Sequence, residues 1–356
     1  MICALILLFL IFSKAYVEEP VKAVIYSATL WTLYLYAVTE ILSIFSSVRF
    51  IPLLITWLLF DIVLLVFLIL KSDPKSNKAT TSANKATSIT KTPIKDIRTK
   101  KLSNASVIRA IMFISLSIMM LYMACRIVPY NWDSMTYHCA RIANWAHNGS
   151  VAHYAASIMR QVCSPTLAEF VNLNLYVLMN KNDVLFNCVQ CVSYLISVYL
   201  IYKIAEKIGC DDKGAMFASI LFATSPTCFA EALSTQVDEF ATLWMLCYTY
   251  MILEIIYDKT KLQMNRSTFF KMMISSLGIA FGYLTKPTVI IAMMIFTIWM
   301  VVVVIARKNQ IKTITTWIIS VPIMSLVIIL PELVRNLITF NAISPDRAGK
   351  TQIKVQ

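Results

Sequence analysis

"FIPLLITWLLFDIVLLVFLIL", residues 50–70, has one charged residue, Asp61, in 21 positions. Because a bilayer offers no water to backbone N–H and C=O groups, about 20 mostly apolar residues cross it as an α-helix. Further apolar segments follow the same pattern: residues 1–16, 22–48, 104–128, 184–202, 214–230, 240–257, 272–286, 288–305 and 313–331. The sequence therefore predicts an all-α, polytopic integral membrane protein.

The composition agrees with a membrane protein. A mean hydropathy of +0.70 and 14% charged residues exclude an ordinary soluble domain, which carries about 25% charged residues. The net charge of +13 does not require nucleic acid as a partner, since Lys and Arg also accumulate in cytoplasmic loops. The segment 71–103 holds nine Lys and Arg against Asp73 and Asp96, and we interpret it as a basic cytoplasmic linker.

This linker divides the chain into N-terminal membrane segments (1–70), a membrane core (104–345) and a tail (346–356). If the linker is cytoplasmic, alternation of the membrane segments makes 129–183 the first extracytoplasmic loop. The loops then assigned to the cytoplasm contain nineteen of the 32 Lys and Arg residues, which agrees with the positive-inside rule.

The same alternation brings charged residues from four segments to the outer surface. They are Asp133, His138, Arg141, His153, Arg160, Glu169, Glu231, Asp238, Glu239, Lys286, Glu332 and Arg335. A single charge at a helix end can simply extend its head into water. A set of this size next to the membrane is costly and indicates a functional site.

The first outer loop contains "NWDSMTYHCARIANWAHNGSVAHY", residues 131–154, with all three histidines. The spacing of its apolar residues predicts a short amphipathic helix in the membrane interface, with Trp132 and Trp145 at headgroup depth and a turn at "HNGS". Asp133 either acts as a general base toward an acceptor hydroxyl or caps this helix. The histidine spacing matches no common zinc motif. The apolar positions are Met135, Cys139, Ile142 and Ala146.

Two cations and one acid elsewhere in the chain need partners. In "GYLTKPT", residues 282–288, Lys286 lies between apolar segments without a local acid, and Pro287 ends the helix. A lipid phosphate is the most plentiful anion for such an ammonium. Arg335 in "PELVRN" is a second candidate, with Glu332 as a competing partner. Asp238 in "STQVDEF" is also explained by a capping box with Thr235.

The nine cysteines are scattered, mostly inside apolar segments, where they behave as small hydrophobic residues. Cys188 and Cys191 are neighbours one helical turn apart. A disulfide between Cys139 and Cys163 is an alternative that the sequence leaves undecided, and it requires that their loop is extracytoplasmic.

Several motifs in order resemble bacterial members of the GT-C superfamily, polytopic glycosyltransferases related to protein O-mannosyltransferases and to the aminoarabinose transferase of lipid A. The resemblance covers about residues 104–345. Besides the first-loop segment, it is carried by "RQVCSPTLAEF", "ATSPTCFAEALSTQVDEF", "GIAFGYLTKPT" and "PELVRN". It implies a GT-C-like helix bundle in the cell membrane, whose first extracytoplasmic loop contains short interfacial helices.

The resemblance also implies a function. A sugar would pass from a polyprenyl phosphate to an extracytoplasmic acceptor, which is a glycan, a lipid or a protein, with inversion at the anomeric carbon. Asp133 matches the acidic residue that the superfamily places in the first outer loop. Relatives often have a second acid just before the loop's proline, but Cys163 and Ser164 precede Pro165 here.

Glu169 is therefore the expected second catalytic acid, and this departure leaves a role for a divalent cation undecided. Relatives usually continue with more membrane helices, so a short variant, a fragment and a truncated product all stay open. We expect Lys286, Arg335 and Arg160 to hold the donor phosphate. We expect substrate contacts from Tyr137, His138, Arg141, His153, Tyr154, Gln161 and Asp238.

Two other classes of protein share some of these features. A transporter or flippase of lipid-linked sugars would also use basic residues near a phosphate, but it predicts internal repeats, and the sequence has no clear repeat. A non-catalytic scaffold would leave Asp133 and Lys286 without a task. The sequence favours the glycosyltransferase.

Overall fold

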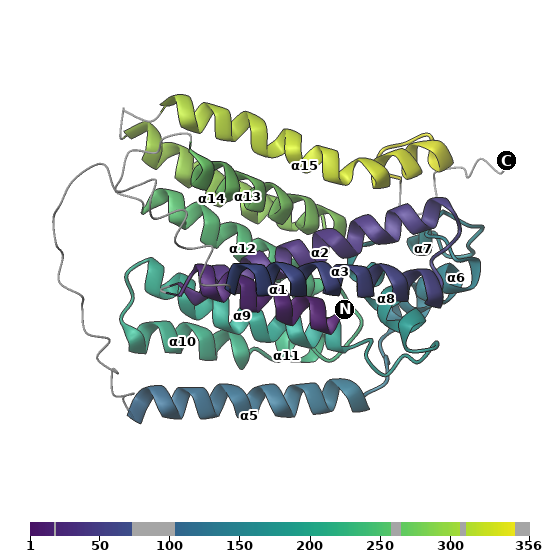
Figure 1. The fold of residues 1–356 in the computed structure, drawn as a ribbon, viewed down its shortest axis with the longest axis horizontal. Helices are drawn as coiled ribbons and strands as arrows, with labels where there is room; N and C mark the ends of the chain where they lie inside the picture. Colours follow the sequence, from purple (N-terminus) through teal and green to yellow (C-terminus); the bar gives the residue numbers. More distant parts are fainter. Residues whose placement is uncertain (18, 73–103, 258–264, 307–310, 346–356) are drawn as a thin grey trace.

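The computed structural model describes residues 1–17, 19–72, 104–257, 265–306 and 311–345. The predicted linker from residue 73 onward and the predicted tail 346–356 lie outside these residues. Within the described part the chain is helical and contains no strand (Figure 1). Eight of the described helices are long and apolar enough to cross a membrane, which confirms the predicted all-α, polytopic architecture.

The N-terminal segments form α1 (Ile2–Ala15), α2 (Pro20–Ile44) and α3 (Phe50–Ser72). The expected hairpin of α2 and α3 is confirmed, and α1 packs against both of its helices. The 14 residues of α1 reach about 21 Å at 1.5 Å per residue, less than the ~30 Å of a hydrocarbon core. Helix α1 is therefore too short to cross the membrane alone, which differs from the membrane segment that we predicted for residues 1–16.

The core is built around α12 (Asp238–Ile256), and 89% of its most apolar stretch is buried inside the bundle. It packs against α9 (Cys188–Lys207), α13 (Arg266–Thr285) and α14 (Val289–Ala306), and α15 (Ile311–Phe340) packs on α13. Trp244 of α12 meets Phe281 of α13 edge to face at 4.8 Å. By contrast, α5 (Asn104–Arg126) lies at the edge of the bundle beside α9 (Figure 1). Only 11% of its apolar stretch is buried.

The predicted membrane segment 214–230 is two helices, α10 (Asp212–Ala223) and α11 (Pro226–Glu231). The break falls at Thr224 and Ser225 because Pro226 cannot continue α10 and instead begins the next helix. Neither piece is long enough to count as a spanning helix. Together they return the chain along the bundle, so that α9 and α12 begin at the same end (Figure 1).

The last membrane segment is longer than predicted. We expected a segment over 313–331 followed by a loop, but α15 continues through Pro322 and Pro331 to Phe340. Glu332 and Arg335 therefore lie on a helix that packs into the bundle, and this explains why their side chains find partners there.

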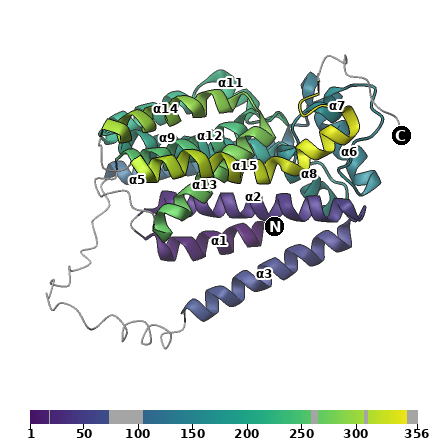
Figure 2. The ribbon, with the colours of Figure 1, turned by 90° about the horizontal axis from the view of Figure 1, so that it is seen from above.

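The predicted outer loop forms a cap at one end of the bundle, opposite the end where α3 stops and α5 begins (Figures 1 and 2). It contains the short π-helix η1 (Ser134–His138) and the α-helices α6 (Cys139–Asn148), α7 (Arg160–Cys163) and α8 (Leu167–Leu178). Gly149 ends α6 with φ +68°, and a Cβ there would lie 2.4 Å from the carbonyl oxygen of Ser46. Only glycine fits this turn.

The helix predicted after Asp133 exists, but its buried face differs from the predicted one. Met135 is 60% exposed, whereas Arg141 is fully buried. Trp132 is 80% exposed, as an interfacial residue would be, but Trp145 is 3% exposed and packs edge to face on Phe170. The buried face could not be predicted from the apolar spacing, because Arg141 forms an ion pair with the buried Glu169 and its side chain therefore lies inside the protein.

Candidate active site

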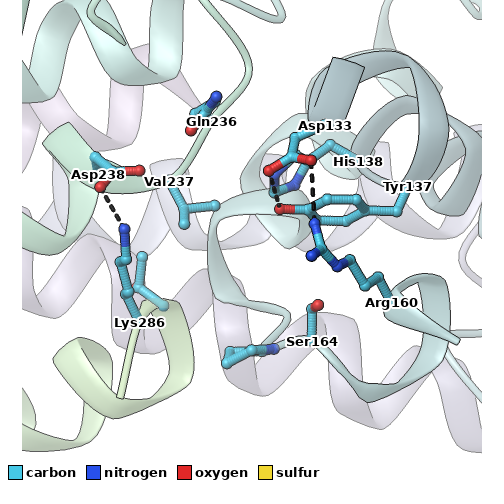
Figure 3. Close-up of a pocket in the computed structure, with 11 residues that line it drawn as sticks. Asp133, Tyr137, His138, Arg160, Ser164, Gln236, Val237, Asp238 and Lys286 are labelled. Carbon is cyan, nitrogen blue, oxygen red and sulfur yellow. Dashed lines mark hydrogen bonds and ion pairs between the residues drawn. The ribbon is translucent and has the colours of Figure 1, made fainter. Parts of the chain in front are cut away.

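A cavity of about 210 Å³ lies where the cap meets the bundle (Figure 3). Its walls come from η1, α7 and the loop after it, the start of α12, and the junction of α13 and α14. The cavity thus joins three sequence regions that are far apart in the chain. The lining residues are Asp133, Tyr137, His138, Arg160, Ser164, Pro165, Gln236, Val237, Asp238, Thr285 and Lys286.

Asp133 points its carboxylate into this cavity (Figure 3). The alternative role as a helix cap is not observed, because the Asn131 side chain accepts the Ser134 N–H at 2.7 Å and Asp133 caps nothing. The Asp133 carboxylate instead accepts hydrogen bonds from the Tyr137 hydroxyl and from Arg160, each at 3.3 Å. Burial, together with Asp133, raises the pKa of Tyr137, which keeps its hydroxyl a donor.

Lys286 faces Asp133 from the other wall (Figure 3). It follows the last residue of α13 in an extended conformation, which the next residue, Pro287, favours. Its Nζ is 2.5 Å from Oδ1 of Asp238, the first residue of α12. The α13 C-terminus favours the cation and the α12 N-terminus favours the anion. The alternative capping box with Thr235 is not formed, since α12 has no side-chain cap.

The cavity therefore holds two ion pairs, Asp133 with Arg160 and Asp238 with Lys286. Lys286 and Asp238 are 41% and 36% exposed, so water screens their attraction and a ligand can compete for either charge. Glu231 lies near this group, where burial and Asp238 raise the pKa of its carboxyl although Lys286 acts in the opposite direction.

Glu169 is buried behind the cavity wall, 1% exposed, and does not line it. It accepts a hydrogen bond from Nδ1 of His138 at 2.5 Å and forms an ion pair with Arg141. Burial would raise the pKa of Glu169, but the positive charge of Arg141 and the contact with His138 outweigh it and lower this pKa. Glu169 is therefore an anion that holds two neighbours in place.

These neighbours shape the cavity. Arg141 donates to the carbonyl oxygens of Ser164 at 2.7 Å and Pro165 at 3.1 Å, so it fixes the loop that follows α7. His138 lines the cavity, and its buried Nε2 has no hydrogen-bond partner in the described part of the chain. His138 thus keeps one ring nitrogen available to a ligand.

Arg335 lies outside the cavity. Its guanidinium binds both carboxylate oxygens of Glu40 on α2, each at 3.0 Å, and Glu332 at 2.5 Å. Thr166 donates to the same Glu332 at 3.2 Å. Two carboxylates already more than balance the charge of this 12% exposed arginine, which joins α15 to α2.

The three remaining predicted residues lie in the cap, and the cavity is not lined by them. The Tyr154 hydroxyl donates to Oε1 of Gln161 at 3.1 Å, and Nε2 of Gln161 donates to the Thr136 carbonyl at 2.8 Å. The His153 ring packs edge to face on Phe340 at 4.9 Å. Burial, then Arg335 and Arg141, lower the pKa of His153 to about 3, so this ring is neutral.

Sequence reasoning missed five lining residues, which are Ser164, Pro165, Gln236, Val237 and Thr285. Each lies inside a motif that was singled out, next to a residue or a landmark named there. A search of neighbours within "STQVDEF" and "YLTKP" would have found three of them. The donor set also bears on metals: throughout the described ranges, no group of three or more His, Cys, Asp and Glu side chains is arranged to hold a metal ion.

Comparison with known families gives a match that covers part of this site. The sequence model described as dolichyl-phosphate-mannose-protein mannosyltransferase matches residues 164–334, which include Asp238 and Lys286. The resemblance to GT-C membrane glycosyltransferases is thereby confirmed. The match supports a membrane glycosyltransferase of the mannosyltransferase kind. No curated protein and no solved structure gives a significant match.

Proposed function

We propose that this protein transfers one sugar from a polyprenyl phosphate to a hydroxyl acceptor on the extracytoplasmic side of the cell membrane. One observation carries the proposal: an accessible carboxylate, Asp133, and an accessible ammonium, Lys286, line the same cavity at one end of a membrane bundle. The family match supports the class of reaction.

Asp133 acts as the general base. The acceptor oxygen attacks the anomeric carbon, its proton passes to the Asp133 carboxylate, and the bond between that carbon and the phosphate oxygen breaks. Attack from the face opposite the leaving group inverts the anomeric configuration. A positioned general base contributes about 10²- to 10⁴-fold in rate. The hydrogen bonds from Tyr137 and Arg160 orient the carboxylate.

Lys286 and Arg160 bind the phosphate, whose negative charge grows as the bond to the sugar breaks. Cations already placed around a leaving group stabilise that charge at little cost in rearrangement. The phosphate displaces Asp238 from Lys286, which the exposure of this pair permits. A phosphate contact of Arg335 remains a prediction, and its ion pairs with Glu40 and Glu332 favour a structural role instead.

Glu169 acts through its neighbours rather than on the sugar. It is buried behind the wall, where it orients His138 toward the cavity and holds Arg141 on the Ser164–Pro165 carbonyls. We therefore assign Glu169 a positioning role, and His138 a contact with a sugar hydroxyl through Nε2.

The cavity is small. Pockets for drug-sized ligands measure roughly 300–1,000 Å³, and this cavity of about 210 Å³ fits one sugar with its phosphate better than an oligosaccharide. The two carboxylates that line it are each paired with a cation. The donor set thus does not fit a divalent cation, and no step of the reaction is assigned to one.

Transfer by purified protein from defined polyprenyl-phosphate sugars tests the proposal. Wild-type protein is expected to release polyprenyl phosphate in an acceptor-dependent reaction, and Asp133→Asn is expected to lose at least about 100-fold in turnover. Asp183→Asn is the matched control, because Asp183 is an exposed aspartate of the same predicted loop. Equal turnover by wild type and Asp133→Asn would remove Asp133 from the mechanism.

A further inference from the structure

Two cysteines from different helices meet where α5 ends. Cys125 is in the last turn of α5 and Cys188 is the first residue of α9. Their sulfur atoms are 3.5 Å apart, although 63 residues separate them in sequence. Both side chains are partly exposed, so neither is sealed inside the core.

The backbone around this pair is already held in register. The side-chain amide of Asn187, next to Cys188, donates to the carbonyl of Ile127 at 2.7 Å. Ala124, next to Cys125, and Cys191, one turn after Cys188, are buried in a small cluster to which α5 and α9 both contribute. A disulfide has an S–S length of about 2.05 Å, so the two sulfurs need to approach by about 1.5 Å, which side-chain rotation supplies.

We infer that Cys125 and Cys188 form a disulfide in the membrane-embedded protein. The inference rests on the proposed orientation, which places both thiols at the extracytoplasmic ends of their helices, where disulfides persist. The reaction is an exchange: the two thiols reduce a disulfide of a small molecule or of a thiol-oxidising protein. One Sγ–Sγ bond forms in this chain, and the co-reactant leaves as two thiols.

The bond would matter because α5 is the least enclosed of the core helices next to the site. Only 11% of the apolar stretch of α5 is buried. This helix leads directly to Asn131 and Asp133. The loop closed by the bond contains the whole cap, including His138, Arg160 and Glu169. The disulfide would therefore fix the base of the segment that carries the proposed catalytic carboxylate.

Differential alkylation tests this inference. The full-length protein is alkylated in its membranes without reductant, purified, reduced, alkylated with a second mass label and digested. Cys125 and Cys188 are expected to carry the second label, and the unreduced digest to contain their cross-linked peptides. Cys210, which is exposed at the opposite end of the bundle, is the control and should carry the first label.

Two variants make the result specific. In the Cys188→Ser variant, Cys125 has no partner and should carry the first label. In a separate measurement, reductant should lower the melting temperature of the wild-type protein but not that of the double variant Cys125→Ser/Cys188→Ser. First label on both cysteines of wild type would overturn the inference, as would a cross-link of Cys188 to Cys191. Because the wild-type result decides the matter alone, a variant that fails to fold changes nothing. Sugar transfer is measured separately, so the proposed function can hold where the disulfide fails.

Discussion

Replacement of Lys286 by methionine removes one positive charge from the cavity and keeps a chain of similar length. The fold should survive, because an ion pair as exposed as Lys286 with Asp238 contributes at most about 1 kcal/mol. Donor binding should suffer more. Opposite unit charges 4 Å apart attract by about 1 kcal/mol in water and about 4 kcal/mol at the effective dielectric of a protein surface.

At 41% exposure Lys286 lies between these limits. We therefore expect the phosphate contact to contribute about 2 kcal/mol, which corresponds to roughly 30-fold weaker donor binding. The assay is the initial rate of transfer by protein in lipid nanodiscs as the concentration of polyprenyl-phosphate sugar is varied. Lys286→Met should raise the apparent KM for the donor by about this factor. Lys181→Met, at an exposed lysine of the predicted outer loop, is the matched control.

Asp238 tests the phosphate role of Lys286 in a second way. Because its carboxylate competes with the phosphate for Lys286, Asp238→Asn should lower the apparent donor KM by about two- to fivefold, the value of an exposed ion pair. In the Lys286→Met background the same change should have no such effect. A donor KM within twofold of wild type for folded Lys286→Met, or an equal effect of Asp238→Asn in both backgrounds, would refute the phosphate role.

Three more predictions concern the surroundings of the cavity. Glu169→Gln leaves Arg141 buried without its anion, so it should destabilise the protein by about 3 kcal/mol or more and lower its melting temperature, with Glu231→Gln nearly unchanged. The pKa of His153 is lowered from 6.5 to about 3, so the stability that neutral His153 gives is complete above pH 6.5 and is lost as the pH falls toward 3. The fall in melting temperature from pH 7 to pH 5 should therefore be smaller in His153→Phe, and an identical fall would contradict the burial argument. Chelation with EDTA should leave turnover within twofold, and a tenfold loss that Mg²⁺ restores would show that a cation takes part.

The membrane fold was predictable because lipid imposes one strong rule, and most predicted segments match the described helices. The errors come from features that hydropathy does not measure. Pro226 splits the segment 214–230, whereas Pro331 does not stop α15. Residues 1–16 are apolar enough for a span but form a helix too short to cross alone.

The site was predictable in part. Alternation placed Asp133, Arg160, Asp238 and Lys286 at one end of the bundle, and the structure brings all four to one cavity. Partners from distant segments could not be foreseen. Glu40, for example, binds Arg335 across 295 positions of the chain, and no local pattern indicates such a pair.

The proposed function requires that the cavity lined by Asp133 and Lys286 opens on the extracytoplasmic side. Single cysteines at positions 133 and 286 and, as a control, at Lys203 of the opposite end, can be labelled in intact cells with a membrane-impermeant maleimide, in a protein whose native cysteines are replaced. Positions 133 and 286 are expected to react in intact cells, and position 203 only after permeabilisation. Labelling of 203 in intact cells, with 133 and 286 protected until the membrane is opened, would contradict the proposed function.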